Sequence, residues 1–423
     1  MFITIKMPKD INCHLFGIRN ILVIFVVTSI SLPMAWISFA KILLIFGGLL
    51  YLIRNGISGV DDKVLERSFV VRAILVTLSF FALSTLWSNV DIEVSVWAFL
   101  KHAKLIEIVL IIYLIRNFSE ARLAISSLLF CQSIIIIISW LMVAGFEFPF
   151  SAGSSSLPVV FSESYIDQSL MFVAAAGLLW NLRAVLFWPK WISIILMLMA
   201  LINVFLFMPS RTGFFAGLAS IVISLYWNFF KNCSILKRVI VLIFLLLTIL
   251  AALFLVSKNF HDRSLLVLGE IKNYAIDGKY QNSSAGWRLN TWLLSSKAFL
   301  DSPLIGYGVG SWRGAVRTYQ NDYVDEIGVS EFSNPHQEFL LWIVELGAIG
   351  IFCIGAIIFS VVKDSYIGCL DARRALILIL TVIMIACFMN SALFDDLIGD
   401  YFCITLGVTL SLCYRCSRHK LDH

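Results

Sequence analysis

Long apolar runs recur from one end of the chain to the other, and they constrain the fold more than any other feature. They approach the ~20 residues that an α-helix needs to cross the hydrocarbon core of a bilayer. The composition agrees, since 60% of the residues are hydrophobic, only 14% are charged and the mean hydropathy is +0.91. A membrane β-barrel would instead show alternating segments of ~10 residues. The sequence therefore predicts an all-α polytopic membrane protein.

The apolar runs predict about twelve transmembrane helices, with a long polar segment between the ninth and the tenth. The predicted spans are 20–36, 38–54, 69–87, 98–115, 123–144, 166–182, 191–208, 213–229, 239–256, 336–362, 375–390 and 398–414. The chain divides accordingly into residues 1–256 with spans 1–9, a loop at 257–335, and residues 336–423 with spans 10–12 and a tail.

Basic residues predict the orientation of these spans. Lysines and arginines collect in the connections on one side and in both terminal segments, whereas the short connections on the other side hold only Arg211 away from the helix edges. By the positive-inside rule, both termini are cytoplasmic and the loop 257–335 is external. The net charge of +5 is explained by these connections and indicates no nucleic-acid partner.

The loop 257–335 has the composition of a folded element. It contains Trp287, Trp292, Trp312 and several tyrosines, and Leu289–Leu300 is typical of a helix. We therefore expect a small helical cap rather than a disordered tether. The other external connection of some length, 146–165, is rich in Ser, Gly and Pro, and whether it gates a substrate stays open.

The nine cysteines predict neither a disulfide framework nor a zinc site. None of them lies in the loop 257–335, and Cys413 and Cys416 form the single CxxC motif, with His419 and His423 following closely. This spacing is tighter than that of zinc fingers, and no second cysteine pair exists. Scattered reduced thiols are the favoured interpretation.

A polar tetrad, Asn334–Gln337, lies where the loop re-enters the membrane. Asn334 suits an N-cap, Pro335 suits the first helical turn, and Gln337 suits a capping box. His336 is then expected in the first turn of a helix, where the dipole keeps the imidazole neutral, as a general base requires. The alternative is that His336 only caps the helix or lies hydrated at the interface.

Two arginines are candidates for binding an anion on the external side. Arg211 lies in the short turn Ser210–Gly213, where a charge at the membrane face needs a partner. Arg288 opens the predicted helix of the loop, within Gly286–Asn290. For each arginine taken alone, an interface anchor or an ordinary hydrated side chain is the alternative.

Two further external features are weaker candidates. The segment Pro303–Gly310, which includes Gly308, holds repeated glycines whose amides could face phosphate oxygens, although a structural turn is favoured. Asp395 and Asp396 form an acidic pair between the last two spans, which either orients a catalytic side chain or is simply hydrated.

Together these residues indicate a chemistry that uses neither ATP nor a metal. The sequence contains no Walker motif and no HExxH motif. A lipid diphosphate already carries its leaving group, which arginine forks can stabilise, and the remaining need is a base for an acceptor hydroxyl. One base without an evident covalent nucleophile predicts direct displacement with inversion.

At this point the pattern resembles a known family. His336-Gln337, nine residues and then Gly347-x-x-Gly350 are similar to the histidine motif of the bacterial O-antigen ligases. The turn Ser210–Gly213, Arg288 with its tryptophan and Pro303–Gly310 resemble other marks of that family, as does the layout of spans around one large periplasmic loop.

The resemblance implies transfer of a completed polysaccharide from undecaprenyl diphosphate to the lipid A–core oligosaccharide, at the periplasmic face of the inner membrane. By this analogy His336 activates the acceptor hydroxyl, and Arg211 and Arg288 hold the diphosphate. Asp395 or Asp396 is expected as a supporting carboxylate, and Gln337 and Gly308 as supporting residues of the site. The family implies no metal ion and no cofactor.

Other classes remain open. O-antigen and exopolysaccharide polymerases share the donor chemistry and differ in the acceptor. A transporter or flippase would show two similar halves and charges at the membrane midplane, whereas the large loop here follows the ninth span. A scaffold without catalysis leaves no reason for His336, Arg211 and Arg288 to share one face. Sugar identity, the accepting hydroxyl and the oligomeric state stay open.

Overall fold

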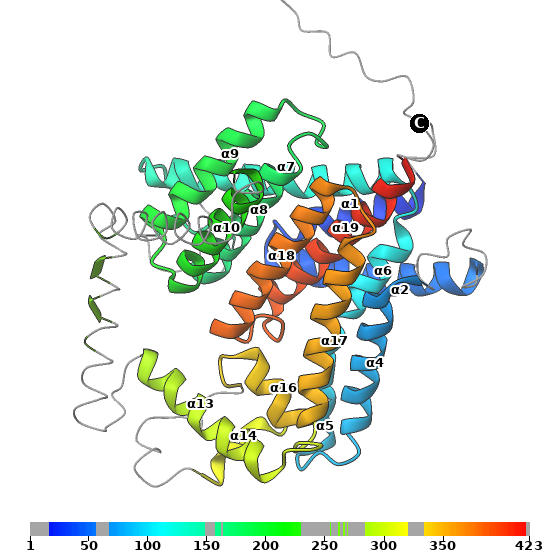
Figure 1. The fold of residues 1–423 in the computed structure, drawn as a ribbon, viewed down its shortest axis with the longest axis vertical. Helices are drawn as coiled ribbons and strands as arrows, with labels where there is room; N and C mark the ends of the chain where they lie inside the picture. Colours follow the sequence, from blue (N-terminus) through cyan, green and yellow to red (C-terminus); the bar gives the residue numbers. More distant parts are fainter. Residues whose placement is uncertain are drawn as a thin grey trace, which may run out of the picture.

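A computed structural model describes residues 17–55, 67–148, 157–161, 164–229, 284–319 and 334–419, with a few isolated positions between 254 and 269. Its elements are helices, and no β-strand occurs in these residues. The predicted span 239–256 and most of the connection 146–165 lie outside the described residues. Figure 1 shows the arrangement, with a bundle of long helices above a smaller group formed by α13, α14 and α16.

The helices before the loop are α1 Ile18–Ser29, α2 Met34–Asn55, α4 Phe69–Ser84, α5 Ile92–Ala103, α6 Ile106–Leu114, α7 Phe118–Val143, α8 Tyr165–Asn181, α9 Lys190–Ile202, the π-helix η2 Asn203–Phe207 and α10 Arg211–Phe229. Those after it are α13 Ser284–Asp301, α14 Trp312–Arg317, α16 Glu338–Leu346, α17 Ala348–Ser365, α18 Leu370–Met389 and α19 Asp396–His419. Each predicted span within the described residues therefore coincides with one or two helices.

Six helices in the described part of the chain are long and apolar enough to cross a membrane. These segments are Met34–Ile53, Phe118–Val143, Lys190–Phe207, Ala348–Ser365, Leu370–Met389 and Asp396–Cys416. The predicted class, a polytopic helical membrane protein, is thus supported, while the count of twelve and the external side of the loop stay predictions.

Helix α19 lies at the centre of the bundle. Of the residues in its most apolar stretch, 94% are buried, and the helix packs against α6, α7 and α18. A buried carboxylate, Asp364 of α17, anchors one end of this packing. It accepts hydrogen bonds from the Val70 amide at 3.0 Å and from the Tyr414 hydroxyl at 2.7 Å. Both bonds go to the same oxygen, Oδ2, which therefore joins the start of α4 to α17 and α19.

Two predicted spans are broken in the structure. The span 98–115 divides into α5 and α6 around Lys104, and the span 336–362 divides into α16 and α17 at Gly347. Gly347 has φ +64°, and a Cβ there would lie 2.5 Å from the carbonyl carbon of Leu304. The amide of Ala348 donates to the Pro303 carbonyl at 2.8 Å. The prediction of one continuous helix over 336–362 is wrong, because the backbone of Pro303 and Leu304 passes against the chain at this glycine.

The described part of the loop is folded, and the helix predicted at Leu289–Leu300 is confirmed within α13. Trp312, which begins α14, is buried, and its Nε1 donates to the Ser295 hydroxyl of α13 at 2.8 Å. Helix α13 also packs against α16. Because the indole of Trp312 is buried and its N–H is hydrogen-bonded, it stabilises the packing of α14 on α13.

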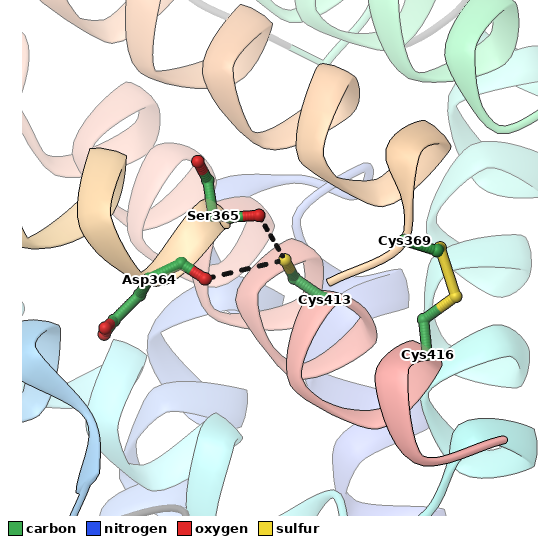
Figure 2. The surroundings of a disulfide bond; sticks show 5 residues. All are labelled: Asp364, Ser365, Cys369, Cys413 and Cys416. Carbon is green, nitrogen blue, oxygen red and sulfur yellow. Dashed lines mark hydrogen bonds between the residues drawn. A yellow bond between two sulfur atoms is a disulfide. The ribbon is translucent and has the colours of Figure 1, made fainter. Parts of the chain in front are cut away.

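The prediction of wholly reduced thiols is wrong in the structure, which contains a Cys369–Cys416 disulfide with a Cα–Cα distance of 5.7 Å. The bond joins the start of α18 to the end of α19 (Figure 2). Cys413 of the same CxxC motif remains a thiol, directed at the carbonyl oxygens of Asp364 and Ser365. The two cysteines of the motif thus have different partners, although their i, i+3 spacing places them on neighbouring positions of one helix face.

Candidate functional site

His336 lies ahead of α16 and not inside it. Its backbone has φ +49°, and its amide donates to the Asn334 side chain at 2.9 Å. Helix α16 begins at Glu338, with Gln337 as its N-cap, and the Gln337 side chain accepts a hydrogen bond from the Leu340 amide. The predicted capping by Asn334 is therefore wrong, because Asn334 bonds two residues ahead and forms a turn instead.

The surroundings of His336 favour a neutral imidazole. Burial lowers the pKa of His336, and the nearby positive charge of Arg288 lowers it further. The ring stays neutral for these reasons and not through the helix dipole on which the sequence argument relied. A neutral ring at physiological pH is able to accept a proton.

Arg288 of α13 brings the predicted residues together. Burial lowers the pKa of Arg288, and the charge of Arg211 lowers it further. Its Nη2 donates to the Asn390 side chain at 2.9 Å. Electrostatic interaction thus connects Arg211 to Arg288 and Arg288 to His336, although these three residues belong to distant segments. We call them the Arg–Arg–His cluster.

Arg211 begins α10, and the turn that carries it is tightly fixed. The Ser210 hydroxyl accepts from the Gly213 amide at 3.0 Å and from the Ser169 hydroxyl of α8 at 2.7 Å. A Cβ at Gly213 would collide with the Ser169 side chain. The sequence Ser-Arg-Thr-Gly therefore serves a close approach of α10 to α8, and it places the arginine at the helix start.

Asn390, at the end of α18, is a member of the site that sequence reasoning missed. Its side-chain oxygen accepts from Arg288, and its amide nitrogen donates to the Thr212 hydroxyl at 3.4 Å. It therefore links the segment that carries Arg288 to the residue next to Arg211. Its side chain is buried, so it has little choice of partner. No local pattern in the sequence reveals this link.

Two contacts fix the segment that carries His336. The Thr291 hydroxyl of α13 lies 3.2 Å from the Pro335 carbonyl, to which it can donate. Glu338, fully buried, accepts from Trp342 Nε1 at 2.7 Å and from the amides of Leu393 and Phe394 at 3.0 and 3.1 Å. The Glu338 side chain thus ties the start of α16, two residues after His336, to the connection that follows Asn390.

Asp395 and Asp396 lie against lysines. Lys104 Nζ donates to the backbone carbonyl of Asp395 at 2.7 Å. Asp396 pairs with Lys104 at 3.7 Å and with Lys101 at 3.9 Å. Burial raises the pKa of Asp395. These contacts direct the acidic pair toward the break between α5 and α6, a neighbourhood that the sequence did not suggest.

The amides of the Pro303–Gly310 segment are already used within the protein. Those of Tyr307 and Gly308 donate to the carbonyls of Val344 and Glu345 at 3.0 and 2.9 Å. That of Gly310 donates to the Glu345 side chain at 2.8 Å. The segment is therefore the structural turn, and Gly308 does not present its amide to a phosphate. Glycine is required there because φ is +88° and a Cβ would collide with the backbone of Ser88.

Glu345 supports this turn through a buried contact with His102. Its second oxygen lies 3.0 Å from His102 Nε2 of α5, and each side chain is 1% exposed. The His102 ring stacks on Phe81 at 4.0 Å. The pair joins α5, α16 and the glycine turn. His102 escaped sequence reasoning because it lies far along the chain in an apolar predicted span.

Comparisons with known proteins give one family match. A comparison with curated proteins finds no match. Residues 194–355 match the family model Wzy_C, described as O-Antigen ligase. The matched segment contains all three members of the Arg–Arg–His cluster, together with the turn at Gly347. The chain therefore carries a domain of the O-antigen ligase family over residues 194–355.

Proposed function

We propose that the protein is an O-antigen ligase, which transfers a finished polysaccharide from undecaprenyl diphosphate to a hydroxyl of the lipid A–core oligosaccharide. The family domain implies a membrane enzyme of glycosyl transfer, with O-antigen ligase or polymerase-type activity. The observation that carries the proposal is the Arg–Arg–His cluster, to which three distant segments contribute one residue each.

The cluster suits a diphosphate that leaves. The positive charge of Arg211 disfavours the cationic form of Arg288, so an anion beside the two guanidinium groups is favoured. Planar guanidinium forks also match phosphate oxygens in pairs. In this proposal Arg211 and Arg288 bind the diphosphate of the donor and stabilise the negative charge that grows as the sugar–oxygen bond breaks.

His336 supplies the base. The neutral imidazole takes the proton of the acceptor hydroxyl as its oxygen attacks the anomeric carbon of the donor sugar. One carbon–oxygen bond forms and the bond to the diphosphate breaks, which inverts the anomeric centre. Undecaprenyl diphosphate leaves, and the proton on His336 passes to solvent. The donor brings its own leaving group, so the proposed reaction needs no nucleotide.

In this proposal the protein lies in the bacterial inner membrane, with both termini in the cytoplasm and the Arg–Arg–His cluster facing the periplasm. The excess of lysine and arginine in the connections on one side supports this orientation. A lipid-linked donor and a lipid-anchored acceptor would both meet the site from the plane of the membrane.

Gel electrophoresis of lipopolysaccharide from a deletion strain tests the function. The strain is complemented with wild type, with His336→Ala or with an empty vector, at matched protein levels. Bare core with accumulated long lipid-linked polymer, corrected by wild type alone, supports the ligase and the base. Core that carries a single repeat unit would instead identify a polymerase. Full-length capped lipopolysaccharide with His336→Ala would exclude the histidine as the base.

A further inference from the structure

Exposed apolar side chains from several segments surround the turn at Gly347. They are Leu86 after α4, Leu300 at the end of α13, Leu304 and Ile305 in the loop, and Ile351 and Phe352 at the start of α17. We call this set the apolar rim. Leu86 is 81% exposed, and Leu300 and Leu304 are each 72% exposed. Such a cluster is unusual on a surface that faces water.

Direct contacts show that these segments are neighbours. Trp87 Nε1 donates to the Ile305 carbonyl at 3.2 Å, which brings the end of α4 to the loop. The Ala348 amide donates to the Pro303 carbonyl, which brings the start of α17 to the same loop. Helices α4 and α17 also pack against each other (Figure 1).

The backbone amides from Gly306 to Gly310 are all hydrogen-bonded within the protein. The amide of Gly306 donates to the Ser302 carbonyl at 3.2 Å, and that of Val309 donates to the Ser84 hydroxyl at 3.1 Å. The amides of Tyr307, Gly308 and Gly310 bond to α16, as described above. Residues 302–310 include no charged side chain. Irregular backbone enters the apolar layer of a membrane only when its polar groups are satisfied in this way.

The rim is continuous with a lipid-facing helix. Helix α17 is one of the candidate membrane spans, and its exposed face runs from Ile351 and Phe352 to Phe359. The rim therefore extends the apolar surface of the span past its first residue and onto the loop.

We propose that the Pro303–Gly310 loop and the turn at Gly347 are embedded in the bilayer, where Leu304 and Ile305 contact lipid acyl chains. The occupant of this surface is the bilayer itself, and the inference does not rest on the proposed function. The embedded turn would hold α16, and with it the segment of His336, at the edge of the membrane, within reach of lipid-linked groups.

Fluorescence quenching in proteoliposomes tests the inference on the full chain. A fluorescent amino acid is introduced by codon suppression in place of Leu304, and Ile305 offers a second position if the first variant does not fold. Phe359 of α17 is the lipid-facing reference, and Arg317, exposed on α14, is the reference for water. Quenching by lipids brominated on their acyl chains is compared with quenching by iodide in the buffer.

We expect the probe at position 304 to follow the one at 359, with strong quenching by brominated lipid and weak quenching by iodide. The probe at 317 should show the reverse. Quenching at 304 by iodide alone would place the loop in water and overturn the proposal. Protection from both quenchers would show that protein covers the rim and would overturn it equally. Neither result bears on glycosyl transfer, which is measured separately.

Discussion

His336 owes its chemistry to side chains that are remote from it in the sequence. Burial and the charge of Arg288 lower its pKa, and Thr291 of α13 contacts the carbonyl of the preceding Pro335. The residues next to His336 in the sequence form the turn, whereas burial and Arg288 determine the protonation state of the imidazole.

The pH dependence of the reaction should show the lowered pKa of His336. The imidazole must be neutral to accept a proton, so a lowered pKa keeps the enzyme active at a more acid pH. We expect the acid limb of kcat/KM to lie below pH ~6.5, the ordinary value for histidine. Transfer from a purified lipid-linked donor, measured across pH, provides the profile. An acid limb at or above the ordinary value would contradict the assignment.

Arg211→Lys keeps the charge at the start of α10 and removes the planar fork. Bonds from charged donors contribute about 1.5–3 kcal/mol each, so the loss of one is expected to reduce kcat/KM at least ~10-fold. The measurement is steady-state transfer at several donor concentrations. Activity equal to wild type would reduce Arg211 to a membrane anchor.

Asn390→Ala removes the acceptor that orients Arg288 and the link to Thr212. We expect a rise in the KM for the donor of about 10-fold, since one hydrogen bond to a charged group is lost. Asn181→Ala is the matched control, because this buried asparagine bonds the Gly177 carbonyl at the far end of α8. Equal effects of the two variants on KM would show that Asn390 serves stability alone.

At the scale of elements, the break between α16 and α17 is the feature that shapes the site. A continuous helix would carry His336 away from Arg288, whereas the turn at Gly347 folds α16 back along α17 (Figure 1). The glycine loop, Glu345 and His102 together hold that turn.

Gly347→Ala should destabilise the protein. Alanine at φ +64° costs about 1–3 kcal/mol, and its Cβ would also collide with the Leu304 backbone. We expect a lower thermal midpoint in detergent, measured by intrinsic fluorescence. Gly355→Ala, within α17 and in open space, is the control and should not lower the midpoint, because alanine favours a helix over glycine. Equal midpoints for the two variants would contradict the role of the turn.

At the scale of the whole molecule, the Cys369–Cys416 bond and the Arg–Arg–His cluster lie at opposite ends of the bundle. Figure 1 shows the end of α19 far from α13 and α14. If the cluster faces the periplasm, the cysteine pair faces the cytoplasm, where thiols are kept reduced. The redox state of this cysteine pair in cells therefore reports the orientation of the protein in the membrane.

In growing cells we expect Cys369 and Cys416 to be reduced and to form the bond after extraction in air. Acid quenching, denaturation and alkylation with a large maleimide reveal the two thiols as a gel shift. Cys369→Ser abolishes the oxidation-dependent change and serves as the control. A bond already present in cells would place that end of the bundle in the periplasm and reverse the proposed orientation.

Local properties of the sequence are sufficient to predict the helices and the types of residue in the site. Apolar length predicts the helices, because a bilayer demands satisfied backbone and apolar side chains over a set distance. The residue types at Arg211, Arg288 and His336 predict anion binding and proton transfer, because that chemistry belongs to the side chains themselves. The predicted helix at Leu289–Leu300 is confirmed for the same local reason.

Tertiary structure alone decided which distant groups meet. The partners of Asn390, Glu338 and His102, and the lysines beside Asp396, are set by the packing of helices far apart in the sequence. The start of α16 and the bend at Gly347 also depend on a second segment that crosses them. A buried polar group must find its partner in three dimensions, and the pattern along one chain does not contain that choice.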